Sequence, residues 1–365
     1  MEERNRSEFG SHKHVFLYIF LIFLLSAAVA TAKDSECRWS GIERVVAIGD
    51  LHGDYNNFVR ILKGVRLVDE SVHWIGGKTH LVQTGDVMDR GPDAKIIFDL
   101  IMNLEKEAEQ AGGMVHMLIG NHEEMNITGI AIRQPRYVLV SQFLSFLPSP
   151  YIELKEKEIR KRFESEDHRG KDSGASLETE LEEFWTNMLR NSDEAKSAYT
   201  AHFNDTYGKW IIEHNAVIKI NGTVFVHGGI SHKYSQWKLE DINTLLRMEL
   251  NKFRIALKQR KSLNFKPRIV YASDGPLWYR GLAQEDSSFT TEVDKILDNL
   301  QAERMVIAHT PQRGSRVVTK EFVSRFDGKV WVIDTGISKA YGGFLSALII
   351  EGGELSLWGE NNENN

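Results

Sequence analysis

The sequence predicts an α/β protein with its functional site at the ends of parallel strands, and two observations support this class. From residue 44 onward, short apolar runs alternate with amphipathic segments of helical length, which is the pattern of βαβ units. Each of the first three apolar runs is followed by a glycine and then by Asp50, Asp86 or Asn121. Ligand sites of such sheets lie beyond the carboxyl ends of the strands, so these three residues mark a candidate site.

The first three strand–helix pairs follow one another closely along the chain. Strands are expected where the apolar runs are continuous, as in strands buried on both faces, at residues 44–50, 80–86 and 112–121. Helices are expected at residues 56–67, at 94–111 and from residue 122 onward. The first helix has one apolar face, formed by Phe58, Ile61, Leu62 and Val65. The alternation implies a parallel sheet with right-handed crossovers.

The next part of the chain differs in composition. Residues 135–204 are charge-rich and have a helical pattern, which predicts a helical insertion with a mobile middle at residues 167–176. The insertion is either a solvated appendage or a lid that shapes substrate access. Strands are expected after it, in a hairpin that turns at Asn221-Gly222 and at residues 304–310, 329–336 and 344–358. The folded domain should span residues 42–358, followed by a polar tail at residues 359–365.

The first 32 residues are expected to be a targeting segment, outside the folded domain. Residues 15–32 are almost wholly apolar, follow a polar leader with Arg4, Arg6 and Lys13, and end in small residues that suit a signal peptidase. The alternatives are an uncleaved anchor, because the run is near the lower length limit for spanning a bilayer, and a buried helix. Cleaved signal and anchor both predict the secretory pathway: the endoplasmic reticulum lumen, a membrane-anchored form or secretion. Membrane contact follows only if the segment stays uncleaved.

Composition limits the classes of function. The chain has 365 residues, of which 42% are hydrophobic and 26% charged, as in a globular protein with a substantial core. A formal net charge of −6 gives no reason to expect a nucleic acid as partner. The single cysteine, Cys37, excludes an internal disulfide.

Short motifs at the strand ends carry residues of the kinds that bind divalent cations and phosphate. They are GDLHG with Asp50 and His52, GDVMDRG with Asp86, Asp89 and Arg90, GNHEE with Asn121 and His122, HGG with His227, and AHTP with His309. Carboxylate, imidazole and amide ligands together suit a pair of borderline divalent cations. Two cations about 3.5–4 Å apart can bind a bridging hydroxide and the oxygens of a phosphoryl group. A nearby arginine can bind phosphate through two hydrogen bonds, and a histidine that is not a ligand could protonate the leaving oxygen.

These motifs, in this order, resemble the signature of the phosphoprotein phosphatases, a branch of the calcineurin-like metallophosphoesterases. The resemblance covers residues 45–358 and implies a central β-sandwich of mixed sheets flanked by helices. It also implies two divalent metal ions, and manganese, iron and zinc all suit the ligands. By this resemblance, one ion is held by Asp50, His52 and Asp86, and the other by Asp86, Asn121, His227 and His309.

The resemblance also implies roles for the remaining residues. His122 would be the general acid, oriented by Asp89, while Arg90 and Arg280, the latter in LWYRG, would bind the phosphate. The implied activity is hydrolysis of phosphate monoesters on proteins, by direct attack of a metal-bridging hydroxide. One alternative is hydrolysis of a small molecule such as a dinucleoside polyphosphate. An alternative of another class is a non-catalytic interaction module on the same fold.

Several segments look most like the Shewanella-like protein phosphatases, namely LVQTGDVMDRG, GPLWYRG, AHTPQ and DTGISKAYGG. The chain lacks the SAPNY stretch with which the serine/threonine phosphatases of animals contact inhibitors. This difference leaves open whether the substrate carries phosphoserine, phosphothreonine or phosphotyrosine. The family usually has glycine at the position of Ala308, before His309; we expect the site to tolerate the added methyl group.

Overall fold

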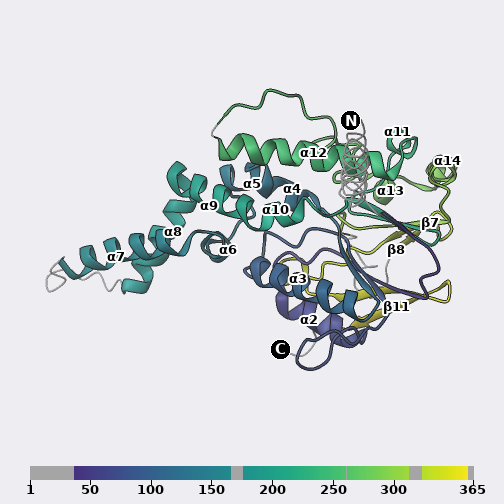
Figure 1. Ribbon diagram of the computed structural model, residues 1–365, viewed down its shortest axis with the longest axis horizontal. Helices are drawn as coiled ribbons and strands as arrows, with labels where there is room; N and C mark the ends of the chain where they lie inside the picture. Colours follow the sequence, from purple (N-terminus) through teal and green to yellow (C-terminus); the bar gives the residue numbers. More distant parts are fainter. Residues whose placement is uncertain (1–36, 166–175, 260, 312–322, 361–365) are drawn as a thin grey trace, which may run out of the picture. The chain divides into compact units, whose positions relative to one another are not determined.

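The computed structural model describes residues 37–165, 176–259, 261–311 and 323–360 (Figure 1). The expected targeting segment lies outside the described residues, as do nearly all of the expected mobile middle of the insertion and most of the polar tail. Within the described ranges, no helix combines the length and the apolar character needed to cross a bilayer.

Two mixed sheets form the centre of the fold. The first has the strand order β11 (Glu354–Glu360), β10 (Leu345–Glu351), β2 (Arg44–Ile48), β3 (His80–Gln83), β4 (Met114–Met117). The second has the order β1 (Arg38–Trp39), β5 (Val217–Ile220), β6 (Thr223–Val226), β7 (Arg304–Ile307), β9 (Val330–Val332), β8 (Val323–Arg325). Side chains of both sheets belong to one buried hydrophobic core. The predicted class, a mixed-sheet α/β fold with flanking helices, is confirmed.

The strand pairing explains where the polar motifs meet. Strands β2, β3 and β4 are parallel, as predicted, and β10 runs antiparallel to β2. In the second sheet, β5 and β6 form the predicted hairpin, with Ile220 paired to Thr223 across Asn221-Gly222. Strands β6, β7 and β9 are parallel to one another. Each sheet therefore has a parallel set of strands whose carboxyl ends can carry site residues.

Helices flank the sheets. Those outside the insertion are α2 (Tyr55–Gly64), α3 (Ala94–Gln110), α4 (Asn121–Ile127), α5 (Ile130–Arg133), α10 (Tyr207–Ile211), α11 (His232–Ser235), α12 (Leu239–Lys258), α13 (Gly281–Gln284), α14 (Thr290–Leu300) and the 3₁₀ helices η2 (Ser287–Phe289) and η4 (Lys339–Tyr341). Helix α2 begins after Asp54, whose side chain accepts the N–H of Asn57, as a helix N-cap does. It buries Phe58, Ile61 and Leu62, the face that the sequence predicts.

The described residues of the segment predicted as an insertion form four helices, α6 (Val140–Ser145), α7 (Ser149–Ser165), α8 (Leu177–Asn191) and α9 (Asp193–Asp205). Helices α7 and α8 extend away from the sheets, whereas α9 contacts α4 (Figure 1). Aromatic side chains from α6 and α9, among them Phe143, Tyr199 and Phe203, are fully buried against one another. This end of the segment is therefore part of the core, unlike the solvated appendage that composition suggested for the whole of it.

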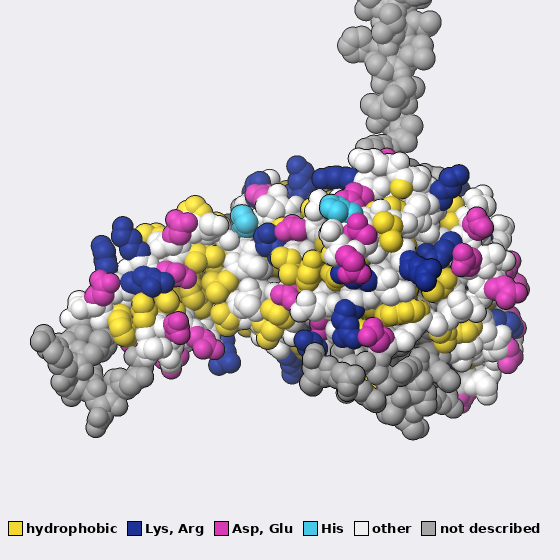
Figure 2. All heavy atoms as spheres, turned by 90° about the horizontal axis from the view of Figure 1, so that it is seen from below, with side chains coloured by type: hydrophobic (Ala, Val, Ile, Leu, Met, Phe, Trp, Pro, Cys, Tyr) yellow, Lys and Arg dark blue, Asp and Glu magenta, His cyan; other side chains and the backbone are white. Residues whose placement is uncertain are grey.

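The described surface carries mixed charge. Figure 2 shows Lys and Arg side chains interspersed with Asp and Glu on one face, and no large patch of a single sign on that face of the described residues. A nucleic-acid-binding protein typically has a basic stripe, and the face in Figure 2 shows none among the described residues.

Candidate metal centre

The predicted site residues gather at the carboxyl ends of the parallel strands. Asp50 follows β2, Asp86 follows β3, and Asn121 follows β4, while His227 and His309 follow β6 and β7. All five side chains are buried. Because the two parallel sets end at the same edge of the fold, residues from both sheets meet there.

The backbone at the site is strained. His52, Asp86, Asp89, Arg90 and His309 have φ values of 42°, 57°, 67°, 67° and 64°, in the left-handed region that residues other than glycine seldom adopt. Such conformations cost about 1–3 kcal/mol each and cluster at functional sites.

Gly120 packs against Asp86 so closely that no other residue fits at its position. A Cβ atom on Gly120 would lie 2.3 Å from Oδ1 of Asp86 and 2.5 Å from its backbone nitrogen. The glycine in the GNHEE motif therefore lets two strand ends approach closely.

One cluster forms around His227, which is completely buried. Its Nε2 atom lies 2.9 Å from Oδ1 of Asn121, 3.1 Å from Nδ1 of His309 and 3.3 Å from Oδ2 of Asp86. Its Nδ1 atom lies 2.9 Å from the carbonyl oxygen of Thr84, to which only a protonated nitrogen can donate. In the neutral ring, Nδ1 therefore carries the proton and Nε2 presents a lone pair to the cluster.

A second cluster shares Asp86 with the first. Nδ1 of His52 lies 2.9 Å from the carbonyl oxygen of Met88, and its Nε2 faces Oδ2 of Asp86 at 3.9 Å and Oδ2 of Asp50 at 4.0 Å. The other oxygen of Asp86, Oδ1, accepts the N–H of His122 at 2.9 Å, which turns Oδ2 toward both clusters. Asp86 thus has the position that a bridging ligand needs.

The side chains present fit divalent cations. Ligand atoms of Asp86, His227 and His309 all lie within 4.8 Å of one another, and so do those of His52, Asp86 and His122. Nε2 of His227 faces oxygens of Asn121 and Asp86 that carry lone pairs, and atoms that only accept hydrogen bonds repel one another unless a cation or a proton lies between them. The contacts from the Nδ1 atoms of His52 and His227 to backbone carbonyls are those that orient histidine ligands in metal sites.

The pKa values of the imidazoles also suit metal binding. Burial and the nearby His122 lower the pKa of His52 to about 4, and burial and His227 lower the pKa of His309 well below its usual value. Both rings are therefore neutral at neutral pH, the form in which histidine binds metals. Burial alone would raise the pKa of Asp86, but His227, His122 and His52 hold it well below its usual range.

His122 and Asp89 form a hydrogen-bonded pair beside the clusters. Nδ1 of His122 lies 2.6 Å from Oδ2 of Asp89, and its Nε2 faces Oδ2 of Asp86 at 3.9 Å. Burial by itself lowers the pKa of His122, but Asp86 and Asp89 outweigh this effect and raise it to about 9. The ring can therefore carry a proton at neutral pH, as a general acid must.

The two predicted phosphate-binding arginines lie in different surroundings. The guanidinium carbon of Arg90 is 4.2 Å from the ring centre of Tyr137 and 4.8 Å from that of Tyr341, so the two rings restrict its motion. Nη1 of Arg280 donates to the backbone carbonyl of His309 at 2.9 Å. The sequence analysis gave neither tyrosine a role: Tyr341 lies in the segment DTGISKAYGG and Tyr137 in no motif, and both are far from GDVMDRG in the chain.

Glu123 is a fully buried carboxylate to which the sequence analysis gave no role. Its Oε1 atom accepts the N–H groups of Val87 and Met88 at 2.9 and 3.3 Å, and its Oε2 atom accepts those of Asp86 and Gly120 at 2.8 and 2.9 Å. It therefore fastens the loop after β3 to the start of α4. A signal was present, because a glutamate three residues after the N-cap is typical of a capping box.

Asp334 is another buried carboxylate that the sequence analysis missed. It follows β9 as Asp86 follows β3, and this position was the available signal. Its Oδ1 accepts the N–H of Gly336 at 3.3 Å, while Oδ2 has no hydrogen-bond partner among the described residues. Burial, together with Asp334 and Asp86, raises the pKa of Asp50 well above its usual value. Bound cations would offset this crowding of negative charge.

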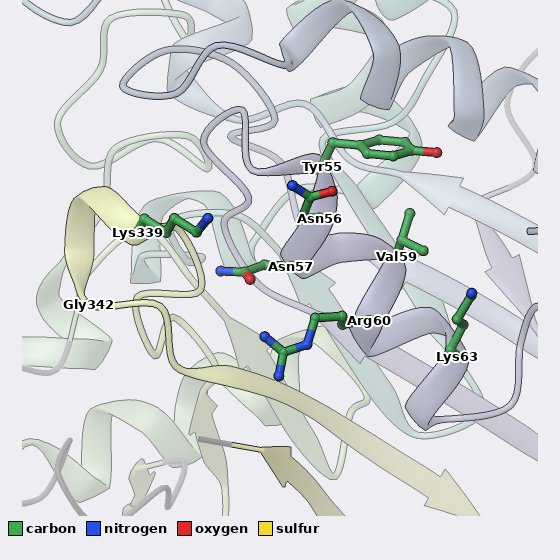
Figure 3. A pocket seen from close by; sticks show the side chains of 8 residues that line it. All are labelled: Tyr55, Asn56, Asn57, Val59, Arg60, Lys63, Lys339 and Gly342. Carbon is green, nitrogen blue, oxygen red and sulfur yellow. The ribbon is translucent and has the colours of Figure 1, made fainter. Parts of the chain in front are cut away.

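Two hollows lie along segments that are close in sequence to site residues. One, of about 610 Å³, lies between α2 and the loop before β10 and is lined by Arg60, Lys63 and Lys339 among others (Figure 3). The other, of about 620 Å³, is lined by Trp278 and Arg280 together with further aromatic and polar residues. Each contains or adjoins a segment that carries site residues.

Comparison with known proteins agrees with this fold. The chain matches the calcineurin-like phosphoesterase family over residues 43–313, and it therefore belongs to that family. The class that the fold and the site define is thus a metallophosphoesterase, as the motifs predicted.

Its relatives include Shewanella-like phosphatases, in agreement with the sequence segments noted above. Shewanella-like protein phosphatase 1 of Plasmodium berghei is 27% identical over 92% of this chain and 78% of that protein. Shewanella-like protein phosphatase 2 of Arabidopsis thaliana is 29% identical over 83% of this chain and 74% of that protein. A crystal structure of the cold-active protein-tyrosine phosphatase of a Shewanella species has a TM-score of 0.62 and 28% identity, and covers 89% of this chain and 82% of that one. Family and relatives together support phosphatase activity.

Proposed function

We propose that this protein is a metal-dependent phosphoprotein phosphatase that hydrolyses phosphate monoesters without a covalent phosphoenzyme. The proposal rests on one observation: side-chain atoms that can bind metal gather around Asp86, and beside them Nδ1 of His122 lies 2.6 Å from Oδ2 of Asp89. The relatives support a protein substrate, because two are named protein phosphatases and the similar crystal structure is of a protein-tyrosine phosphatase.

The ligands are divided between two ions that share Asp86. One divalent cation would be held by Asp50, His52 and Asp86, and the other by Asp86, Asn121, His227 and His309. When bound, the pair supplies an activated water for direct attack on phosphorus. We further propose that Mn²⁺ supports activity in vitro, with iron or zinc as other metals that suit these ligands.

The chain's own residues have distinct tasks in this mechanism. Arg90 and Arg280 neutralise and orient the phosphate, and the aromatic rings around Arg90 limit the entropy lost when it binds. His122 presents Nε2 to the space that the ligands surround, and from there it protonates the leaving oxygen. Asp89 fixes the orientation of the ring and stabilises its charged form, as the carboxylate of a catalytic triad does.

The surroundings of the site also favour a polypeptide over a compact small molecule. A phosphopeptide extends on both sides of its phosphorylated residue and can use the hollow that Arg280 lines, as well as the surface around the hollow at α2. The hollow next to α2 is lined by cationic side chains, including Lys339, which suits acidic residues near the phosphate. The other hollow offers Trp278 and Tyr279 for side-chain contacts.

Parallel assays test this proposal. Hydrolysis of phosphoserine, phosphothreonine and phosphotyrosine peptides is measured beside that of diadenosine tetraphosphate, with and without a chelator. The proposal predicts chelator-sensitive release of phosphate, with higher kcat/KM on at least one class of phosphopeptide than on the dinucleotide. Preference for the dinucleotide would instead identify a small-molecule hydrolase. Failure to hydrolyse any substrate in the presence of metal would favour a non-catalytic module.

We also propose that the chain enters the secretory pathway, because residues 15–32 are apolar and follow a polar, basic leader. The proposed substrates are therefore phosphoproteins that the enzyme meets in that compartment or at its membrane.

A further inference from the structure

The carboxylate of Asp89 accepts hydrogen bonds from three buried side chains. His122 Nδ1 lies 2.6 Å from Oδ2, Gln142 Nε2 lies 2.7 Å from Oδ1, and Asn126 Nδ2 lies 3.2 Å from each oxygen. Asp89, Asn126 and Gln142 are each 0% exposed. With these donors in place, the carboxylate that orients the proposed general acid has a single orientation.

Gln142 also holds the backbone of Asp89. Its Oε1 atom accepts the N–H of Asp89 at 2.8 Å, so a single amide group binds both the main chain and the side chain of this residue. Asp89 has a φ of 67°, and a residue in that region keeps its conformation only when its surroundings fix it. Gln142 supplies part of that constraint.

Tyr199 fixes the second amide. Its hydroxyl donates to Oδ1 of Asn126 at 2.8 Å, which leaves Nδ2 of Asn126 facing Asp89 and, at 2.9 Å, the carbonyl oxygen of His122. Without the hydroxyl, the amide of Asn126 could turn over and present its oxygen to the carboxylate. Tyr199 is itself 0% exposed, within the aromatic core that α6 and α9 share.

The two outer members of this network come from the segment predicted as a helical insertion. Gln142 lies on α6 and Tyr199 on α9, and α9 contacts α4 (Figure 1), which carries His122 and Asn126. These side chains reach the Nδ1 side of His122 through Asp89, away from Nε2 and the ligand clusters. A lid would contact the other side, where the substrate binds.

We propose that the helical insertion positions the general acid, with Gln142 and Tyr199 holding Asp89 and Asn126 in the arrangement that His122 needs. This inference rests on the proposed function, and both residues are positioning residues that act through Asp89. The rival explanation is that the network only fastens the insertion to the rest of the fold. In that case its loss would lower stability, or activity on all substrates alike.

The dependence on the leaving group separates the two explanations. p-Nitrophenolate leaves with little need of a proton, whereas phenolate is more basic and needs the acid more. Both phosphates are small, so the comparison does not require a protein substrate. Gln142→Met removes the two hydrogen bonds of the amide to Asp89, and a longer one to the Tyr199 hydroxyl at 3.5 Å, at similar side-chain length. Tyr199→Phe removes one hydroxyl. Tyr234→Phe is the matched control, because it removes a hydroxyl of a tyrosine that is also buried but donates to the backbone carbonyl oxygen of Arg268 at 3.2 Å.

The expected result is a preferential loss on phenyl phosphate. General acid catalysis contributes typically about 10²–10⁴-fold, so Gln142→Met should lower kcat on phenyl phosphate about ten-fold more than on p-nitrophenyl phosphate. Tyr199→Phe should show a smaller preferential loss of about three-fold, since it acts one residue further away. Tyr234→Phe should leave the ratio unchanged. On an Asp89→Asn background, Tyr199→Phe should add no further change to the ratio, because both act through one carboxylate.

The full-length chain is used, with metal content and folded state measured for each variant. Equal losses on both substrates with metals retained, or unchanged ratios, would overturn the inference. If Gln142→Met fails to fold, the ratio of kcat on the two phosphates in Tyr199→Phe decides between the two explanations. A wild-type protein that hydrolyses neither phosphate nor any phosphopeptide would overturn the proposed function itself, and with it the basis of this inference.

Discussion

The exchange Glu123→Gln, which replaces one buried oxygen by an NH₂ group, should strongly destabilise the metal-free protein. Each oxygen of Glu123 accepts two backbone N–H groups, which belong to Val87 and Met88 at Oε1 and to Asp86 and Gly120 at Oε2. Glutamine keeps one oxygen, so its NH₂ group must face two donors, and two hydrogen bonds are lost.

Hydrogen bonds to a charged group contribute about 1.5–3 kcal/mol each, so the two lost bonds lower the free energy of unfolding by at most about 3–6 kcal/mol. That is a large part of the stability of a typical domain, about 5–15 kcal/mol. The net fall is smaller, because glutamine also removes the buried charge whose cost raises the pKa of Glu123. Glu124→Gln is the matched control, because Glu124 is equally buried but accepts no backbone N–H group: its contacts are with the side chains of Thr128, whose Oγ1 donates to it at 3.2 Å, and Trp278. The control should cost about 1 kcal/mol or less.

The assay is urea-induced unfolding followed by circular dichroism, in a chelator so that bound ions do not contribute to stability. Burial and Asp86 raise the pKa of Glu123 to about 7, and burial raises that of Glu124 to about 8, so the measurement is made above the higher of the two values, where both carboxylates are ionised. If the two variants differ by less than about 1 kcal/mol, near the size of one ordinary hydrogen bond, Glu123 does not hold the metal-site loops together.

The remaining predictions concern the acid, inhibitors and location. His122→Asn should lower kcat on a phosphoserine peptide by about 10²–10⁴-fold and on p-nitrophenyl phosphate several-fold less; equal losses, with metal content unchanged, would show that His122 does not donate the proton. Because the chain lacks the SAPNY stretch, natural toxins that block the serine/threonine phosphatases of animals should inhibit it poorly, and tight inhibition in a dose–response assay would refute this. A fluorescent fusion carrying residues 1–40 should enter the endoplasmic reticulum, and cytosolic or mitochondrial fluorescence would contradict the proposed location.

The strands and ligand motifs were predictable because their signals are local. A buried strand needs a continuous apolar run, and a glycine followed by a polar residue marks its end, as in Gly85-Asp86 and Gly120-Asn121. Glu123 and Asp334 carried the same kind of local signal and could have been assigned from it. The parallel strands then bring these separate motifs together without any further information from the sequence.

The support of the general acid was not predictable in this way. Gln142 and Tyr199 lie on helices whose composition resembles that of a solvated appendage, and each reaches its partner across many residues of chain. Their orientation depends on how α6 and α9 pack against α4. Tyr137 and Tyr341, which enclose Arg90, are brought together by tertiary packing for the same reason.

The central claim is that Asp86 joins two cation sites in a hydrolytic centre. The most direct test measures metal binding and activity on the same protein. Chelator-treated protein is titrated with Mn²⁺ in a calorimeter, and phosphatase activity is measured on the same samples. The proposed ligand sets predict two ions per chain, with activity returning as they bind. Asp86→Asn should impair both sites, whereas Asp50→Asn should impair one and leave more activity. Full activity in verified metal-free protein, or two ions bound undiminished by Asp86→Asn, would contradict the account.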